Sequence, residues 1–274
     1  MSSLTILTLA IIAAANMAVG GCIGICGIAG FLLPMLYTGG LGFDVTYALA
    51  LSFLAFLVSG IIGSFNYYKA GNLEVRMSLK LGIGSLIGAI AGVSLQSMIE
   101  KSTAKTILYL VVLFSGASIL VRMWNEKRKA DSVSAKKVIS DGKNSASSNP
   151  SHPKSIADHM GFLIFLGITT GAICSLSGAG GPVLVMPLLV ACGVSARIAV
   201  GVALFDSVFI AIPACIGYLS RITWTEILGL LVLIVLTHGI GVWLGSRFAG
   251  KVPVQGLKIF VAVFSVCIAI YMLA

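Results

Sequence analysis

Apolar runs long enough to cross a bilayer recur along this chain, and they constrain its fold more than any other feature. A helix of about 20 residues spans the hydrocarbon core of a membrane, and runs of that length occur in both halves of the sequence. Hydrophobic residues make up 58% of the chain and charged residues 10%, with a mean hydropathy of +1.06. A soluble domain has only about 45–50% apolar residues. The sequence therefore predicts an all-α, multi-pass membrane protein.

Two glycine-rich breaks interrupt apolar segments at corresponding places in the two halves. The first covers residues 20–30 and the second covers residues 171–182. Backbone inside a bilayer must satisfy its own hydrogen bonds, so irregular stretches persist there only where they are packed in protein or line a cavity. Paired breaks of this kind indicate the substrate site of a transporter.

A polar segment divides the chain into two membrane repeats, residues 1–125 and 159–274. The segment between them, 126–158, is rich in Lys, Ser and Asn, and we expect a flexible, basic, cytoplasmic linker. Each repeat is expected to hold a broken hairpin followed by three spans. The expected hairpin segments lie near 4–19 and 24–37, and near 160–176 and 182–193; the expected spans lie near 45–66, 77–97 and 105–123, and near 198–219, 226–246 and 255–273.

The basic residues indicate how the two repeats are oriented. The linker carries many Lys and Arg residues, so the positive-inside rule places it in the cytoplasm. Parallel repeats would put Arg197 and Arg247 on the outer face. If each broken hairpin instead enters and leaves by one face, the basic residues left outside are Lys101, Lys105 and Arg221. The second arrangement has the stronger bias, and it predicts two inverted repeats whose glycine-rich tips meet near the midplane.

Several motifs resemble the TauE/SafE sulfite exporter family. They are the breaks with the apolar, proline-containing stretches that follow them (31–34 and 183–187), the stretch 48–53 and the corner 67–72. Both repeats carry the pattern, with Tyr67 and Tyr218 closing equivalent spans. The resemblance implies a multi-pass inner-membrane transporter of sulfite, sulfonates or related sulfur oxyanions. The second repeat departs from the pattern at 201–205, where the first has Ser52.

The breaks supply the candidate substrate-binding residues. No Lys or Arg lies in the middle of a predicted span, so positive potential has to come from N–H groups at helix N-termini. Glycine lets an anion approach such backbone closely. The candidates are Cys22, Gly24, Cys26, Gly27, Gly30, Ser52, Cys174, Ser175, Ser177, Gly178, Gly180 and Gly181. The alternative is that the glycines only allow helices to pack closely.

Two titratable residues within the spans are candidates for ion coupling. Asp206 is the only acid within an apolar span, where a carboxylate costs about 2.5–3.5 kcal/mol on insertion scales. It can carry a proton or hold a cation coupled to anion transport. His238 is a candidate relay partner for Asp206. Each also has a structural alternative, a hydrogen bond to a neighbouring helix.

The cysteines support a second hypothesis, a membrane thiol–disulfide electron carrier. Cys22 and Cys26 lie one helical turn apart, and Cys174 is their counterpart in the second repeat. Thiol–disulfide exchange between such residues can pass reducing equivalents across a membrane. The spacing is Cys-x3-Cys rather than Cys-x-x-Cys, and a buried cysteine also serves as a small hydrophobic residue.

The remaining functional classes find little support in the sequence. No P-loop, HExxH motif, Gly-x-Ser-x-Gly motif or zinc-ligand cluster occurs, so we expect neither an enzyme nor an ATP-driven pump, and no cofactor or metal. The net charge of +9 comes from loops rather than from a basic face, which argues against nucleic-acid binding. The expected partners are a small anion and the lipid bilayer. The sequence leaves a homodimer open.

Overall fold

The computed structural model describes residues 6–27, 29–100, 160–222 and 228–250, with parts of 102–121 and 263–270. This part of the chain is helical and contains no strand. Six of its helices are long and apolar enough to cross a membrane: α1 (Ile6–Cys26), α3 (Val45–Lys69), α4 (Val75–Met98), α6 (Met160–Ser177), α8 (Ala196–Leu219) and α9 (Leu228–Phe248). The prediction of an all-α, multi-pass membrane protein is confirmed. The expected linker and most of the spans near 105–123 and 255–273 lie outside the described residues.

Shorter helices follow α1 and α6 and complete the two broken hairpins. The first comprises α2 (Leu32–Met35) and the π-helix η1 (Leu36–Gly40), and the second is α7 (Gly181–Ala191). The hairpin boundary expected near residue 19 is wrong, because α1 continues to Cys26. The first break is therefore shorter than the glycine pattern indicated.

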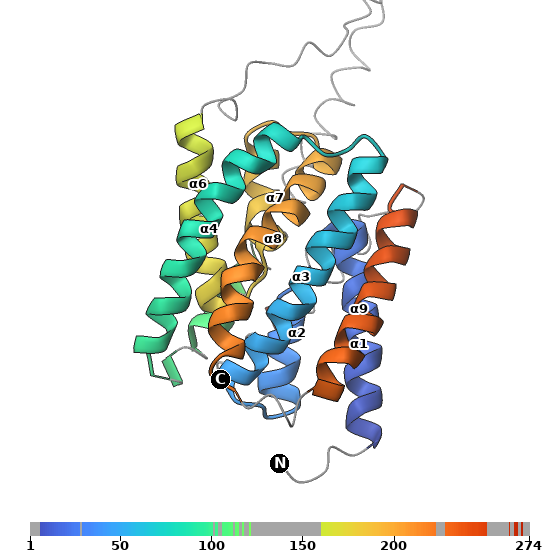
Figure 1. Cartoon of the computed structure of the whole chain (residues 1–274), viewed down its shortest axis with the longest axis vertical. Helices are drawn as coiled ribbons and strands as arrows, with labels where there is room; N and C mark the ends of the chain where they lie inside the picture. Colours follow the sequence, from blue (N-terminus) through green and yellow to red (C-terminus); the bar gives the residue numbers. More distant parts are fainter. Residues whose placement is uncertain are drawn as a thin grey trace, which may run out of the picture.

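The helices of the two halves exchange equivalent contacts. Helix α1 packs against α9 as α6 packs against α4, while α3 and α8 cross in the centre and each also packs against one of the outer helices. Corresponding helices run in opposite directions in Figure 1: α1 and α3 run from the lower to the upper end, and α6 and α8 run from the upper to the lower end. Helix α7 returns to the upper end and α2 lies in the lower half.

Glycines at equivalent positions allow close contact in two helix pairs, α4 with α6 and α1 with α9. A Cβ at Gly88 on α4 would collide with the carbonyl oxygen of Ile168 on α6. A Cβ at Gly241 on α9 would collide with the carbonyl oxygen of Met17 on α1. Small residues allow this approach between membrane helices. Met17 and Ile168 are 151 residues apart and Gly88 and Gly241 are 153 apart, so these offsets relate equivalent positions.

Basic residues gather at the upper end of the bundle in Figure 1, which we call the basic end. Lys69 closes α3, Arg76 is the second residue of α4, Arg197 is the second residue of α8, and Arg247 lies in the last turn of α9. Arg221, which follows α8, lies at the opposite end.

Large apolar side chains remain exposed on the outer faces of the helices. Phe65 on α3 is 56% exposed, Phe165 on α6 is 65% exposed, and Ile216 on α8 is 69% exposed. A surface this apolar is suited to lipid rather than to water. The bundle therefore has the exterior of a membrane protein.

Candidate functional site

Each broken hairpin turns at a glycine with a positive φ. Gly27 has φ 73° after α1, and Gly178 has φ 74° after α6. Their N–H groups donate to the carbonyls of Ile23 and Cys174, four residues earlier, both at 2.8 Å. Glycine adopts this helix-ending conformation without steric penalty. The second break contains a further positive-φ glycine, Gly180 with φ 76°, directly before α7.

The two breaks lie against each other in the interior of the bundle. A Cβ placed on Gly30 would be 3.5 Å from the carbonyl oxygen of Ala179. The ring of Phe56 on α3 packs on both breaks, 3.1 Å from the Cβ position of Gly30 and 3.3 Å from that of Gly180. Backbone from the two halves of the chain therefore meets at one buried location.

Equivalent tyrosines fix the ends of the two broken helices. The hydroxyl of Tyr67 on α3 donates to the carbonyls of Gly24 and Ile25, both at 3.2 Å. The hydroxyl of Tyr218 on α8 donates to the carbonyl of Ser175 at 2.7 Å. Carbonyls in the last turn of a helix have no intrahelical partner. Each tyrosine therefore satisfies the helix end beside a break, at positions 151 residues apart.

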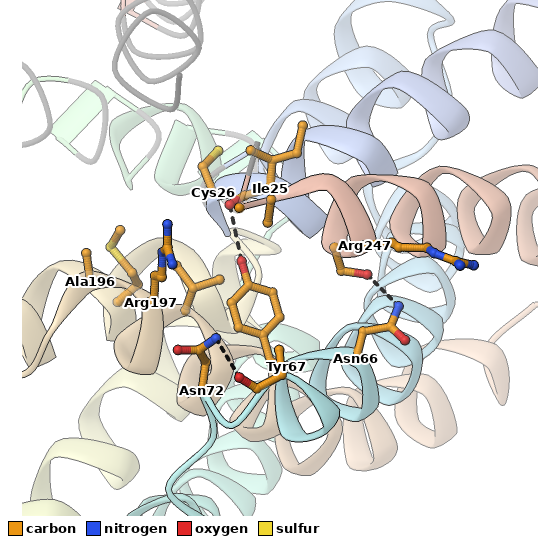
Figure 2. A pocket seen from close by; sticks show the side chains of 14 residues that line it. Ile25, Cys26, Asn66, Tyr67, Asn72, Ala196, Arg197 and Arg247 are labelled. Atoms are coloured by element: carbon orange, nitrogen blue, oxygen red, sulfur yellow. Dashed lines mark hydrogen bonds between the residues drawn. The ribbon is translucent and has the colours of Figure 1, made fainter. Parts of the chain in front are cut away.

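A polar pocket of about 420 Å³ reaches the end of α1, directly before the first break, from the basic end (Figure 2). The last residues of α1 form one wall, the ends of α3, α8 and α9 form others, and Met186 of α7 also lines the pocket. Its polar lining residues are Asn66, Tyr67, Asn72, Arg197, Ser246 and Arg247. Of the predicted substrate-binding residues, Cys26 lines this pocket.

The predicted hydroxyl donors are bonded within their own helices. Ser52, Ser175 and Ser177 each donate to a carbonyl three or four residues earlier. Ser177 also accepts a hydrogen bond of 3.3 Å from the N–H of Ala179. Of the three serines, Ser177 is therefore the one whose hydroxyl contacts the backbone of a break.

Some predicted site residues lie in helices beside the breaks. A Cβ on Gly24 would be 2.6 Å from a backbone nitrogen of α9, so this glycine permits helix packing. Cys26 donates to the carbonyl of Cys22 at 3.1 Å, within α1. Cys174 on α6 donates to the carbonyl of Gly180 at 3.4 Å, across the second break. Cys174 and Gly180 are thus in direct contact, whereas Cys22 and Gly24 are outside the turn itself.

Asp206 is fully buried in α8 and faces α4. Its two carboxylate oxygens are buried, and neither has a hydrogen-bond partner within the described part of the chain. Ser85 on α4 is the hydroxyl directed towards it, but Ser85 donates to the carbonyl of Gly167 at 3.3 Å. Cys174 also lies close enough to interact electrostatically with the carboxyl group.

His238 is buried on the other side of the bundle. Its Nδ1 donates to the carbonyl of Asn16 on α1 at 3.1 Å, and among the described residues Nε2 has no partner. The side chain of Asn16 in turn donates to the hydroxyl of Tyr37 at 2.7 Å. Helix α3 lies between α8 and α9 (Figure 1). The structure therefore does not bring His238 next to Asp206.

The pocket also contains residues that the sequence did not single out as a site. Arg197 lies at the start of a span rather than in its middle, as the second residue of α8, and is reached from the basic end. Asn72 lies in the corner after α3 that carries the family resemblance. The sequence signal that could have found this site is Arg197 itself, a basic residue at the start of α8, the span that corresponds to α3.

Six apolar helices, two broken hairpins that meet inside the bundle and a polar pocket leading to them are the features of a membrane transporter. The comparisons agree: the profile of the Sulfite exporter TauE/SafE family matches residues 8–272. The chain belongs to the TauE/SafE family.

Two curated relatives support the same class. The chain is 22% identical over 243 residues to "Probable membrane transporter protein YdhB" of Bacillus subtilis (strain 168), covering 84% of this chain and 90% of that protein. It is 27% identical over 216 residues to "Probable membrane transporter protein YtnM" of the same organism, covering 76% of this chain and 65% of that protein. No solved structure matches the chain.

Proposed function

We propose that this protein is a secondary transporter of the inner membrane that exports small sulfur-containing anions such as sulfite, thiosulfate or sulfoacetate. Membership of a sulfite exporter family supports the substrate class. The observation that carries the mechanism is the meeting of the two breaks around Phe56, which gathers irregular backbone from both halves at one buried location. Irregular backbone at such a depth is typical of substrate sites in transporters.

The second break offers the backbone donors for the anion. Pro182 has no N–H group, and the N–H of Val183 donates to the carbonyl of Gly180 at 3.3 Å. The N–H groups of Gly180 and Gly181 are the remaining donors at the start of α7. First-turn N–H groups and the helix dipole together favour an anion. The bound anion lies against this turn, and Gly178, Gly27 and Gly30 keep the facing backbone close to it.

The two repeats are inverted in this mechanism, with the basic end in the cytoplasm. The gathering of Arg197 and Arg247 beside Lys69 and Arg76 supports this orientation, because cytoplasmic loops carry an excess of basic residues. The opposite directions of α3 and α8 support it as well. Inverted repeats allow one half to rock against the other around a fixed site, which gives alternating access.

Asp206 couples anion transport to a proton or a cation. Its carboxylate oxygens are buried and have no partner among the described residues, and an uncompensated buried charge is costly. A proton or cation bound at Asp206 removes this cost, and its release restores it, so the occupancy of Asp206 alters the stability of the conformation that buries it. Helix α3 separates His238 from α8, so His238 does not act on Asp206 directly. Its part in coupling depends on its own buried Nε2, which has no partner among the described residues.

Transport by proteoliposomes distinguishes the anion transporter from the thiol–disulfide electron carrier. We expect labelled sulfite flux with wild-type protein, and we expect substantial flux to persist in the Cys22→Ala, Cys26→Ala and Cys174→Ala variants. The three thiols are not joined in disulfides, and losing a thiol leaves the backbone donors in place. Transfer of reducing equivalents that any one substitution abolishes, with no anion flux in the wild type, would establish the electron carrier instead.

A further inference from the structure

Arg197 is placed to meet an anion at the mouth of the polar pocket. It is exposed at the start of α8, and among the described residues its guanidinium has no hydrogen bond or ion pair. It lies beside Tyr67 (Figure 2), whose hydroxyl holds the end of α1. Arg247, by contrast, stacks over the ring of Trp243 at 5.1 Å and points away from Tyr67.

The rest of the pocket lining is compatible with an anion. No Asp or Glu lines the pocket among the described residues; amides and hydroxyls from α3 and α9 line it beside apolar residues such as Val200 and Met186. A volume of about 420 Å³ accommodates a small sulfur oxyanion with part of its hydration shell. The planar guanidinium forms paired hydrogen bonds to two oxygens of an oxyanion.

We propose that Arg197 binds the transported anion in this pocket before the anion reaches the breaks. The proposal rests on the function proposed above and adds a second binding position, at the basic end. An anion held by Arg197 lies next to Tyr67 and Cys26, and movement past these residues leads to the first break. Arg197 therefore sets the affinity with which the transporter loads its substrate from that face.

The test is transport measured separately from each face in membrane vesicles of opposite orientation. We expect Arg197→Gln to raise the half-saturating concentration of sulfite at the basic end by about tenfold or more, since a charge-assisted contact is lost. The value at the opposite end stays unchanged. Arg76→Gln is the matched control, because it removes an exposed arginine at the same end but outside the pocket.

The outcomes separate the two proposals. Unaltered loading by Arg197→Gln at the basic end, or an equal loss at both ends, would overturn the role of Arg197 while leaving the transport function standing. Absence of flux of sulfite, thiosulfate and sulfoacetate in the wild type would overturn the proposed function instead.

A different observation concerns the position equivalent to this pocket at the opposite end. The offsets of 151 and 153 residues relate Ala70 and Ala249, which line the pocket, to Arg221 and Gln96. Small residues in the pocket thus correspond to long polar ones at the other end. The space that is open at the basic end is occupied by side chains at its counterpart.

Arg221 ties together the helices at that counterpart position. Its Nη1 donates to Oε1 of Gln96 at 2.9 Å, and its Nη2 donates to the carbonyl of Val93 at 3.2 Å. The guanidinium also lies over the ring of Tyr218 at 5.5 Å. Gln96 is buried, so these contacts join the end of α8 to α4 over the tyrosine that holds α6.

We infer that Arg221 and Gln96 close the transport path at the end opposite the basic end. In the structure a pocket opens at the basic end, and the bonded side chains of Arg221 and Gln96 occupy the equivalent position at the other end. Opening of the second end then requires Arg221 to leave Gln96 and Val93. This device complements Arg197, which loads the anion at the open end.

Equivalent cysteines provide a matched test. Val93 and Ser246 occupy equivalent positions on α4 and α9, 153 residues apart, and Ser246 lines the open pocket. We expect Ser246→Cys to react with an impermeant thiol reagent from the basic end, and Val93→Cys to be protected from the opposite end. Adding Arg221→Ala to Val93→Cys should raise the labelling rate of the introduced cysteine by about tenfold, because the loss of one charged hydrogen bond shifts the opening equilibrium by about that factor.

Labelling is compared with that of the wild-type cysteines, and thermal unfolding of each variant verifies that it is folded. Rapid labelling of Val93→Cys with Arg221 intact would overturn the inference. So would unchanged protection after removal of Arg221 in a folded variant.

Discussion

Replacing Gly180 with leucine is expected to lower the affinity for sulfite about ten- to over a hundredfold. A side chain at this position separates the anion from the N–H groups at the start of α7. Losing one charge-assisted contact costs about 1.5–3 kcal/mol, which corresponds to that range in affinity. Calorimetric titration with sulfite, thiosulfate and sulfoacetate measures the change.

Backbone conformation makes a second variant necessary. Gly180 has φ 76°, and a Cβ on it would be 3.3 Å from the ring of Phe56, so leucine also strains the fold. Gly181 has no positive φ, and its Cβ position is 3.0 Å from the tip of Ile210 and from the hydroxyl of Ser207. Gly181→Ala therefore adds a methyl group beside the same donors without a positive φ, at the cost of small shifts in Ile210 and Ser207, and we expect it to weaken binding in the same direction.

Gly229 provides the control for both substitutions. It lies on α9, and a Cβ there would meet no atom within 4 Å. Gly229→Leu and Gly229→Ala should retain wild-type affinity and stability. Unaltered anion binding in folded Gly180→Leu and Gly181→Ala proteins would show that the anion binds away from the second break.

The sequence predicted the helical class and the positions of most spans because their signal is local. Long apolar runs define α3, α4, α8 and α9 without knowledge of their partners. The equivalence of Tyr67 and Tyr218 was also visible as a repeated corner. Their shared task, holding the end of a broken helix, emerged only with the hydrogen bonds to α1 and α6.

The roles of individual glycines could not be separated by sequence. Gly24 and Gly27 are three residues apart in one glycine-rich stretch, yet Gly24 packs on α9 whereas Gly27 forms the turn with φ 73°. A helix-packing glycine and a turn glycine both need only the absence of a side chain. The difference depends on which backbone lies opposite, and that is a tertiary property.

The polar pocket was missed for a related reason. We expected positive potential deep in the membrane to come from backbone alone, because no cation lies mid-span. The pocket instead reaches inward from the end of the bundle, so Arg197 at the start of α8 is next to Tyr67. The pairing of Arg221 with Gln96, 125 residues earlier, is likewise invisible without the fold.

Asp206→Asn is expected to retain anion binding and to lose the dependence of flux on the proton gradient. The amide has nearly the shape of the carboxylic acid but cannot take up or release a proton. In liposomes, the ratio of wild-type flux with and without an imposed pH gradient should be well above one. For Asp206→Asn the ratio should fall to about one, because the group that binds the coupled charge is gone.

A surface carboxylate provides the matched control for this substitution. Asp44 is the N-cap of α3 and accepts a hydrogen bond of 3.0 Å from the N–H of Thr46, and asparagine caps a helix about as well as aspartate. Asp44→Asn should therefore leave both stability and coupling unchanged. A gradient dependence that persists in Asp206→Asn would place coupling elsewhere. Loss of the gradient response while the anion still binds identifies a coupling residue. Loss of sulfite binding in that variant would instead make Asp206 part of the anion site or its support.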